Sequence, residues 1–153
     1  MRETTLCYLE QDGQYLMFYR NAKPNDPNKG KWIGLGGKIE AGETPEQCVC
    51  REVLEETGLS ITQYAYRGVV NFESDRDGCE RMHVFTATAW DGTLNMDCDE
   101  GELRWIPKAD VTTQYPVWEG DAVFLRALER GDPFFHLTLT YRNNRLIGTH
   151  MEW

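Results

Sequence analysis

Residues 36–59 decide the fold of this chain and read GGKIEAGETPEQCVCREVLEETGL. Thr44 and Gln47 stand three residues apart, which is typical of a capping box at the first turn of a helix. Gly58 occupies the place of the left-handed residue that commonly ends a helix. The stretch therefore predicts a glycine-rich loop followed by a helix over about residues 45–57.

This helix is expected to have two different faces, because successive residues turn by about 100°. Its apolar side chains fall on one side, which we expect to face the core: Val49, Cys50, Val53, Leu54 and Thr57. Glu52, Glu55 and Glu56 fall within an arc of roughly 100° on the opposite side. At spacings of three and four residues, like charges cost about 0.2–0.5 kcal/mol per pair in an isolated helix. The cluster is therefore either a solvated acidic face or a site for a hard divalent cation, Mg²⁺ or Mn²⁺, which binds carboxylate oxygens.

The same stretch resembles the signature of the Nudix family at every fixed position. That signature runs Gly, five residues, Glu, seven residues, Arg-Glu, an apolar residue, any residue, Glu-Glu, any residue, Gly and an apolar residue. The matching residues are Gly37, Glu43, Arg51, Glu52, Val53, Glu55, Glu56, Gly58 and Leu59. At a frequency of about 7% per residue type, the seven fixed matches would arise by chance on the order of once in 10⁸ windows. The resemblance favours the metal site over the solvated face.

The resemblance implies hydrolysis of a nucleoside diphosphate linked to another group, with Mg²⁺ or Mn²⁺ as cofactor. The metal ligands that it implies are the carbonyl of Gly37 and the carboxylates of Glu52, Glu55 and Glu56. The catalytic residues that it implies are Glu52, Glu55 and Arg51, with Glu43 and Arg51 bracing the loop against the helix. Water is expected to attack the β-phosphorus, and a carboxylate near the metal to take its proton. The sequence leaves open which Glu is the base.

The flanks of the signature resemble the MutT/MutX group of 8-oxo-dGTP diphosphatases, which remove oxidised purine nucleotides from the precursor pool. The segments that carry this likeness are residues 23–37, 99–107, 118–121 and 132–135. Within them, Glu100 matches a further metal-binding Glu, with an ordinary surface acid as the alternative. Lys38 is expected to contact a phosphate, and Arg20 and Lys23 are further candidates, with solvated charges as the alternative.

Trp118 and Asp121 match positions that hold the base in mammalian relatives of this group. An indole can stack on a purine, and a carboxyl group can hydrogen-bond its edge. The alternatives are a core Trp and an Asp that caps the following helix. Gly120 and Ile33 depart from those relatives, which carry Asp and Asn there, so base recognition is expected to differ in detail.

Composition limits the class of protein. The 153 residues suit one Nudix domain over residues 1–153, and the net charge of −9 disfavours binding to a nucleic acid polymer. Five cysteines without a Cys-x-x-Cys pair favour free thiols, and no apolar run approaches membrane-spanning length. We therefore expect a cytoplasmic protein that binds a small nucleotide and no membrane; its oligomeric state is not readable.

The rest of the chain predicts a mixed α/β fold, which the resemblance narrows to an α/β/α sandwich with a mixed sheet. Strands are expected over residues 4–10, 14–20, 32–40, 60–72, 82–90, 103–106, 134–141 and 145–153. A charged loop is expected over residues 73–81 and a second helix over residues 122–130.

The signature defines a reaction type and leaves the substrate open. A nucleotide sugar, dihydroneopterin triphosphate or a noncanonical nucleoside triphosphate are alternatives to an oxidised purine. A binding module without activity is a further alternative, but such domains usually lose the carboxylates that are intact here. An RNA-end hydrolase is disfavoured by the lack of a basic stripe.

Overall fold

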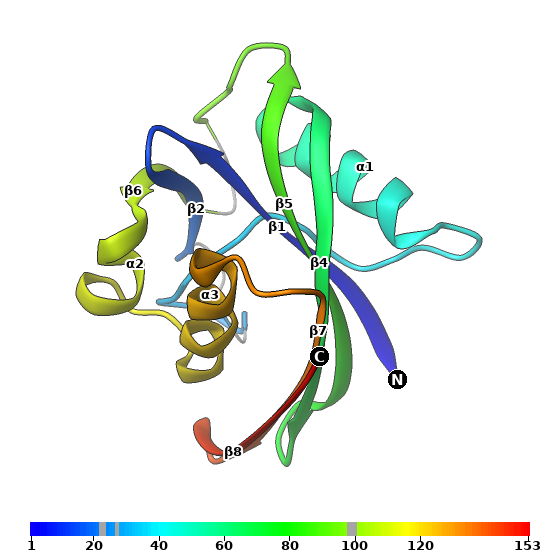
Figure 1. Ribbon diagram of the computed structural model, residues 1–153, viewed down its shortest axis with the longest axis vertical. Coiled ribbons are helices and arrows are strands. Elements are labelled where there is room, and N and C mark those ends of the chain that lie inside the picture. The colour runs from blue at the N-terminus through cyan, green and yellow to red at the C-terminus, as the bar shows by residue number, and fades with distance from the viewer. Residues whose placement is uncertain (22–23, 27, 98–100) are drawn as a thin grey trace.

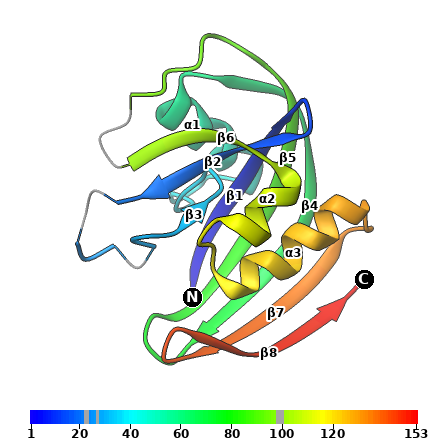
Figure 2. The ribbon, with the colours of Figure 1, turned by 90° about the vertical axis from the view of Figure 1, so that its left-hand side faces the viewer.

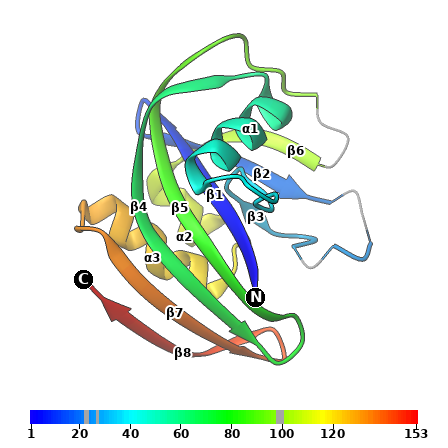
Figure 3. The same ribbon diagram turned by 90° about the vertical axis from the view of Figure 1, so that its right-hand side faces the viewer.

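The computed structural model describes residues 1–21, 24–26, 28–97 and 101–153, so Lys23 and Glu100 lie outside the described residues. The strands are β1 (Arg2–Gln11), β2 (Gln14–Arg20), β3 (Trp32–Ile33), β4 (Ser60–Ser74), β5 (Gly78–Asp91), β6 (Gly101–Pro107), β7 (Phe135–Arg142) and β8 (Arg145–Glu152). The helices are α1 (Pro45–Thr57), α2 (Lys108–Gln114) and α3 (Glu119–Arg130). Helix α1 covers one face of the sheet, while α2 and α3 cover the other (Figures 1 and 3), which confirms the predicted sandwich. None of the described helices is long and apolar enough to cross a bilayer.

The sheet is mixed, with strand order β3-β2-β1-β5-β4-β7-β8 and β6 paired to β2. β1 runs parallel to β5 and β4 runs parallel to β7, whereas the other pairings are antiparallel. β1 pairs with β2 only at Glu10 and Gln11, so the β2, β3 and β6 ribbon diverges from the rest of the sheet (Figure 2). The glycine-rich loop occupies the resulting gap, where Leu35 pairs with Cys7 and Lys38 pairs with Thr4.

β1 is buried on both faces and supplies both cores. Side chains alternate across a strand, so Leu6 and Tyr8 face α3 while Cys7 and Leu9 face α1. Phe124 of α3 lies 6.3 Å from Tyr8, measured between ring centroids. A strand buried on both sides is a rigid support, and it is this strand that the glycine-rich loop contacts.

Helix α1 has the predicted bounds and the predicted caps. Thr44 and Gln47 form the reciprocal capping box, and Gly58 adopts a φ of 79°. The predicted core face was partly wrong: Leu54 is 48% exposed, Cys50 is only half-buried, and Cys48 is buried instead. The apolar stripe is centred on Val49 and Val53, which moves Leu54 to the rim of a cavity described below.

Three further expectations were wrong. The strand predicted over residues 32–40 ends at Ile33. Beyond it the chain meets β1 only in isolated bridges at Leu35 and Lys38, and between them Gly36 has a φ of 145°, which interrupts the extended run. β4 and β5 extend into the predicted loop at 73–81 and leave a turn at residues 75–77. Helix α2 was missed, since it has seven residues, no side-chain cap and one buried residue, Val111.

Candidate active site

The glycine-rich loop lies in direct backbone contact with β1 and with α1. A Cβ atom on Gly36 would lie 2.0 Å from the carbonyl oxygen of Thr5, so no larger residue fits there. A Cβ atom on Gly37 would lie 2.6 Å from the carboxylate of Glu52. The carbonyl oxygen of Gly37 accepts a 2.8 Å hydrogen bond from the Thr5 amide and longer ones from the Thr5 hydroxyl at 3.5 Å and the Cys48 thiol at 3.7 Å. The two glycines thereby bring the loop backbone against a carboxylate of α1.

Arg51 holds the loop to the helix, as the sequence predicted. Its Nε and Nη2 atoms donate to both carboxylate oxygens of Glu43, at 2.7 and 2.9 Å. Its Nη1 atom donates to Glu52 at 3.0 Å and to Glu55 at 3.3 Å, and Nη2 also donates to the Lys38 carbonyl at 3.2 Å. The bidentate bond to Arg51 lowers the pKa of Glu43 to about 2, and the same bond raises the pKa of Arg51. Both groups therefore stay ionised at neutral pH.

The three carboxylates of α1 line one side of a polar cavity of about 670 Å³. Glu52 is half-buried, and this burial raises its pKa against the opposing effect of Arg51. Glu56 accepts a 2.9 Å hydrogen bond from the Gly36 amide, while the side chain of Glu55 is 59% exposed. Asp97 adds a fourth carboxylate from the segment after β5. Asp97 was not singled out in the sequence analysis.

The donor set of this acidic cavity fits a hard divalent cation. Carboxylate oxygens are the ligands that Mg²⁺ and Mn²⁺ prefer, and no lysine lines this cavity among the described residues. Among the residues that the structure describes, no three His, Cys, Asp or Glu side chains lie close enough together to bind one metal ion as they stand. Arg51 donates hydrogen bonds to Glu52 and Glu55, and the Gly36 amide donates one to Glu56. The three carboxylates therefore line the cavity without converging on one point.

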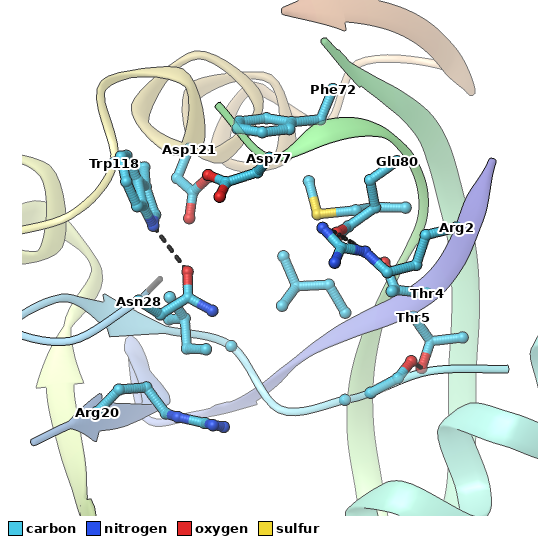
Figure 4. Close-up of a pocket in the computed structure, with 16 residues that line it drawn as sticks. Arg2, Thr4, Thr5, Arg20, Asn28, Phe72, Asp77, Glu80, Trp118 and Asp121 are labelled. Carbon is cyan, nitrogen blue, oxygen red and sulfur yellow. Dashed lines mark hydrogen bonds and ion pairs between the residues drawn. The ribbon is translucent and has the colours of Figure 1, made fainter. Parts of the chain in front are cut away.

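A second cavity, of about 310 Å³, lies on the other side of the glycine-rich loop. It combines apolar and aromatic side chains, including Ile33, Phe72 and Trp118, with polar side chains. The polar ones include Asn28 and three carboxylic acids, Asp77, Glu80 and Asp121 (Figure 4). Three residues line both cavities: Arg20, Gly36 and Gly37. An acidic cavity and an aromatic cavity are therefore adjacent, with the loop backbone between them.

Trp118 lies at the N-terminus of α3 with its indole in the aromatic cavity. Its Nε1 atom donates to Asn28 Oδ1 at 2.8 Å, and its ring meets that of Tyr141 edge-on with centroids 5.6 Å apart. The Lys31 ammonium lies 5.2 Å from its centroid. Trp118 packs against the core, as one alternative predicted, and it also lines the cavity, while its stacking on a base stays a prediction.

Asp121 lines the same cavity from the first turn of α3 and is 8% exposed. Burial, followed by the charge of Glu80, raises its pKa from 3.8 to about 7. The N-cap of α3 is Trp118, which makes no side-chain capping bond, so the alternative of Asp121 as N-cap was wrong. The carboxyl group is thus free of a capping role and can change its protonation near neutral pH.

The packing around position 120 explains why this residue is a glycine. Its amide donates to the hydroxyl of Tyr141 at 2.6 Å, and a Cβ atom would lie 2.5 Å from Leu139 Cδ1. Tyr141 and Leu139 therefore occupy the space that a side chain at Gly120 would need. A side chain at this position would require Leu139 and Tyr141 to shift.

The residues predicted to contact phosphate differ in whether they line the cavities. Arg20 lines both cavities and forms a 2.6 Å ion pair with Asp26. Lys38 is exposed and lines neither cavity. Sequence reasoning missed Asn28 and Phe72, which reach the aromatic cavity from a polar loop and from β4. No local signal marks them, because only the fold brings those segments together.

The NUDIX domain model matches residues 2–128, and the chain belongs to this family of hydrolases of nucleoside diphosphate derivatives. The uncharacterized Nudix hydrolase YvcI of Bacillus subtilis is 31% identical over 145 residues, covering 92% of this chain and 87% of that one. The oxidized purine nucleoside triphosphate hydrolase of Danio rerio is 34% identical over 103 residues, covering 67% and 64%. The CTP pyrophosphohydrolase of Escherichia coli is 29% identical over 128 residues, covering 83% and 90%.

The crystal structure of a MutT protein from Bacillus halodurans superposes with a TM-score of 0.87 at 25% identity, covering 99% of this chain and 98% of that one. The protein is therefore a Nudix hydrolase that acts on small nucleotide substrates. Enzymes of this family generally use divalent metal ions such as Mg²⁺.

Proposed function

We propose that this Nudix hydrolase, as one domain over residues 1–153, converts an oxidised purine nucleoside triphosphate such as 8-oxo-dGTP to its monophosphate and pyrophosphate. The observation that carries the proposal is the adjacency of the two cavities, which share Arg20, Gly36 and Gly37. A flat heterocycle suits the aromatic cavity, and metal-complexed phosphates suit the acidic one. Such an activity would remove oxidised precursors from the cytoplasmic nucleotide pool.

The chemistry is assigned to the acidic cavity. Mg²⁺ or Mn²⁺ bound there supplies positive charge to phosphoryl oxygens and makes water more acidic. The proposed ligands are the carboxylates of Glu52, Glu55 and Glu56, with the carbonyl oxygen of Gly37 and, on sequence resemblance alone, Glu100. Glu52 is the proposed base, because burial makes its carboxylate a better proton acceptor than an exposed one. Arg51 keeps that carboxylate aimed at the cavity.

Phosphate and base are held by separate groups. Arg20, which lines both cavities, is the proposed cation for the phosphates, with Lys38 and, on resemblance alone, Lys23 at the periphery. Trp118 supplies an aromatic surface for the purine, and Asp121 supplies a carboxyl group for its edge. The likeness to the Danio rerio enzyme supports a purine, and the likeness to the Escherichia coli CTP pyrophosphohydrolase supports CTP as the second candidate.

A substrate panel with Mg²⁺ tests the proposal. The panel compares kcat/KM for 8-oxo-dGTP, dGTP, dATP, CTP, a nucleotide sugar and dihydroneopterin triphosphate. We expect 8-oxo-dGTP to exceed dGTP and dATP by at least about tenfold, the discrimination that one additional hydrogen bond provides. Equal values for the three purine triphosphates would remove the sanitising role, and a preference for CTP would replace it. Tight nucleotide binding without hydrolysis would instead identify a binding module.

A further inference from the structure

Thr5 of β1 and Cys48 of α1 form a buried polar pair against the glycine-rich loop. The Thr5 hydroxyl lies 3.3 Å from the Cys48 Sγ atom, and the two residues are 3% and 0% exposed. Their surroundings on this face of β1 are otherwise apolar, since Cys7, Leu9 and Val49 belong to the same core. A buried hydroxyl costs free energy unless it is hydrogen-bonded, so the partners of this pair are informative.

The pair contacts two successive carbonyl groups of the loop. The Gly37 oxygen accepts from the Thr5 hydroxyl at 3.5 Å and from the Cys48 thiol at 3.7 Å, in addition to the 2.8 Å bond from the Thr5 amide. The Lys38 oxygen lies 3.6 Å from the same thiol and accepts from Arg51 Nη2 at 3.2 Å. A thiol carries one proton, so it donates to one of these oxygens at a time. The two side chains thereby surround the Gly37 carbonyl on its buried side.

The loop needs such contacts because its own glycines do not fix the direction of that carbonyl. Glycine has no Cβ atom and rotates about φ more freely than any other residue, and Gly36 adopts a φ of 145°. Every rotation that must be stopped on binding lowers the affinity for a ligand. A metal ion would therefore be bound more tightly by a Gly37 carbonyl that is already held in one direction.

Cys48 also contacts the arginine that orients the carboxylates of α1. Its Sγ atom lies 3.8 Å from Arg51 Nη2, while Arg51 Nη1 donates to Glu52 at 3.0 Å and to Glu55 at 3.3 Å. The thiol thus lies between the carbonyl and the carboxylates that are proposed to bind the same metal ion. A change at this position should alter how the two kinds of ligand are placed relative to each other.

We propose that Thr5 and Cys48 are positioning residues for the metal: together they hold the Gly37 carbonyl in the direction in which it binds Mg²⁺ or Mn²⁺. The inference rests on the metal site of the proposed function, but not on the identity of the nucleotide. It assigns a role in metal binding to two residues outside the fixed positions of the Nudix signature, one of which lies 32 residues before Gly37.

Thr5→Val is the direct test, because it removes the hydroxyl and keeps the shape of the side chain. The measurement is the dissociation constant of Mn²⁺, followed by the electron paramagnetic resonance signal of the free ion. Because Thr5 also lines the aromatic cavity (Figure 4), the full chain is titrated without nucleotide. We expect the constant to rise about tenfold, the low end of the range for residues that orient metal ligands. Thr5→Ser keeps the hydroxyl and should bind Mn²⁺ as the wild type does.

Cys48→Ala and Cys48→Ser make the same comparison from the helix. Alanine removes the donor and should weaken Mn²⁺ binding by a similar factor, whereas serine keeps a donor and should restore most of the affinity. Cys7→Ala is the matched control, since Cys7 is buried in the same core and bonds the loop through its backbone at Leu35. Loss of this buried thiol should lower the stability measured by urea unfolding and keep the wild-type Mn²⁺ affinity.

Wild-type Mn²⁺ affinity in Thr5→Val and Cys48→Ala would overturn the inference. A loss of affinity that Thr5→Ser and Cys7→Ala share would also overturn it, because it would show that the pair only packs the core. A wild type that binds no Mn²⁺ would overturn the inference together with the metal site. A substrate panel without a preference for 8-oxo-dGTP would instead overturn the proposed substrate alone.

Discussion

The acidic cavity and the aromatic cavity are built in different ways from the same chain. Glu52, Glu55 and Glu56 come from a single helix, and the loop that completes their surroundings precedes that helix in sequence. The aromatic cavity collects Asn28 from a loop, Phe72 from β4 and other residues from β1, β5 and the start of α3. The proposed reaction centre is thus local in sequence, whereas the proposed base-binding cavity is assembled by tertiary structure. The two cavities should accordingly respond to mutation in different kinetic parameters.

The largest effect is expected from Glu56→Gln, which removes a proposed metal ligand and keeps the size of the side chain. We expect kcat to fall by about 10²–10³-fold, because charge stabilisation by a bound metal contributes several kcal/mol. Steady-state kinetics at saturating Mg²⁺ measure this loss, and circular dichroism checks that the fold is retained. Glu46→Gln is the matched control, since it changes an exposed residue of the same helix. Full turnover by Glu56→Gln would show that this carboxylate of the acidic cavity is not needed for hydrolysis.

A smaller effect is expected from Arg51→Lys, which keeps the charge and loses the bidentate bond to Glu43 and the bond to Glu52. Groups that orient metal ligands typically contribute 10–100-fold to activity or metal affinity. We expect a loss of about that size, expressed as a higher Mg²⁺ concentration for half-maximal rate with little change in nucleotide KM. A change in KM alone would place Arg51 in substrate binding instead.

The smallest kinetic effect is expected from Asp121→Asn, which acts on the aromatic cavity. KM for an oxidised purine triphosphate should rise about tenfold, the contribution of one or two hydrogen bonds, with kcat little changed. A loss confined to kcat would show that the two cavities are not separable in this way.

The same variant should change the pH dependence of stability. Burial raises the pKa of Asp121 to about 7 from its ordinary value of 3.8, so the native state binds this proton more tightly than the unfolded state. The free energy of unfolding therefore falls as pH rises between these values. Above about pH 7 the buried carboxyl group is ionised, and its destabilising effect reaches its full size. Urea unfolding should show Asp121→Asn to be more stable than wild type at about pH 8, by up to about 4 kcal/mol, and similar near pH 4. Parallel pH profiles for the two proteins would contradict the burial argument.

The sequence predicted those parts of the structure that depend on residues close together in the chain. The bounds of α1 and its caps follow from local spacing, the ion pair of Arg51 with Glu43 was implied by the family resemblance, and all are present. The failures arise where tertiary contacts decide. Gly36 breaks a predicted strand because its backbone must approach Thr5, and Leu54 is exposed because the core lies to one side of its position on the helix.

The aromatic cavity shows the same limit. Trp118 and Asp121 were expected from family resemblance, but Asn28 was not, because it lies beside the cavity through a hydrogen bond to a residue 90 positions away. Likewise, Gly120 cannot be interpreted without Tyr141, which lies in β7, the next element along the chain, and fills the space beside it. Physical reasoning about such positions requires the packed structure.

The central claim is that the carboxylates of α1 carry out metal-dependent release of pyrophosphate. The most direct measurement is product release from 8-oxo-dGTP before EDTA treatment, after it, and after addition of Mg²⁺ or Mn²⁺. The account predicts no turnover after chelation, recovery with either metal, and one pyrophosphate with one nucleoside monophosphate per event. Turnover that survives chelation, or release of orthophosphate in place of pyrophosphate, would contradict it.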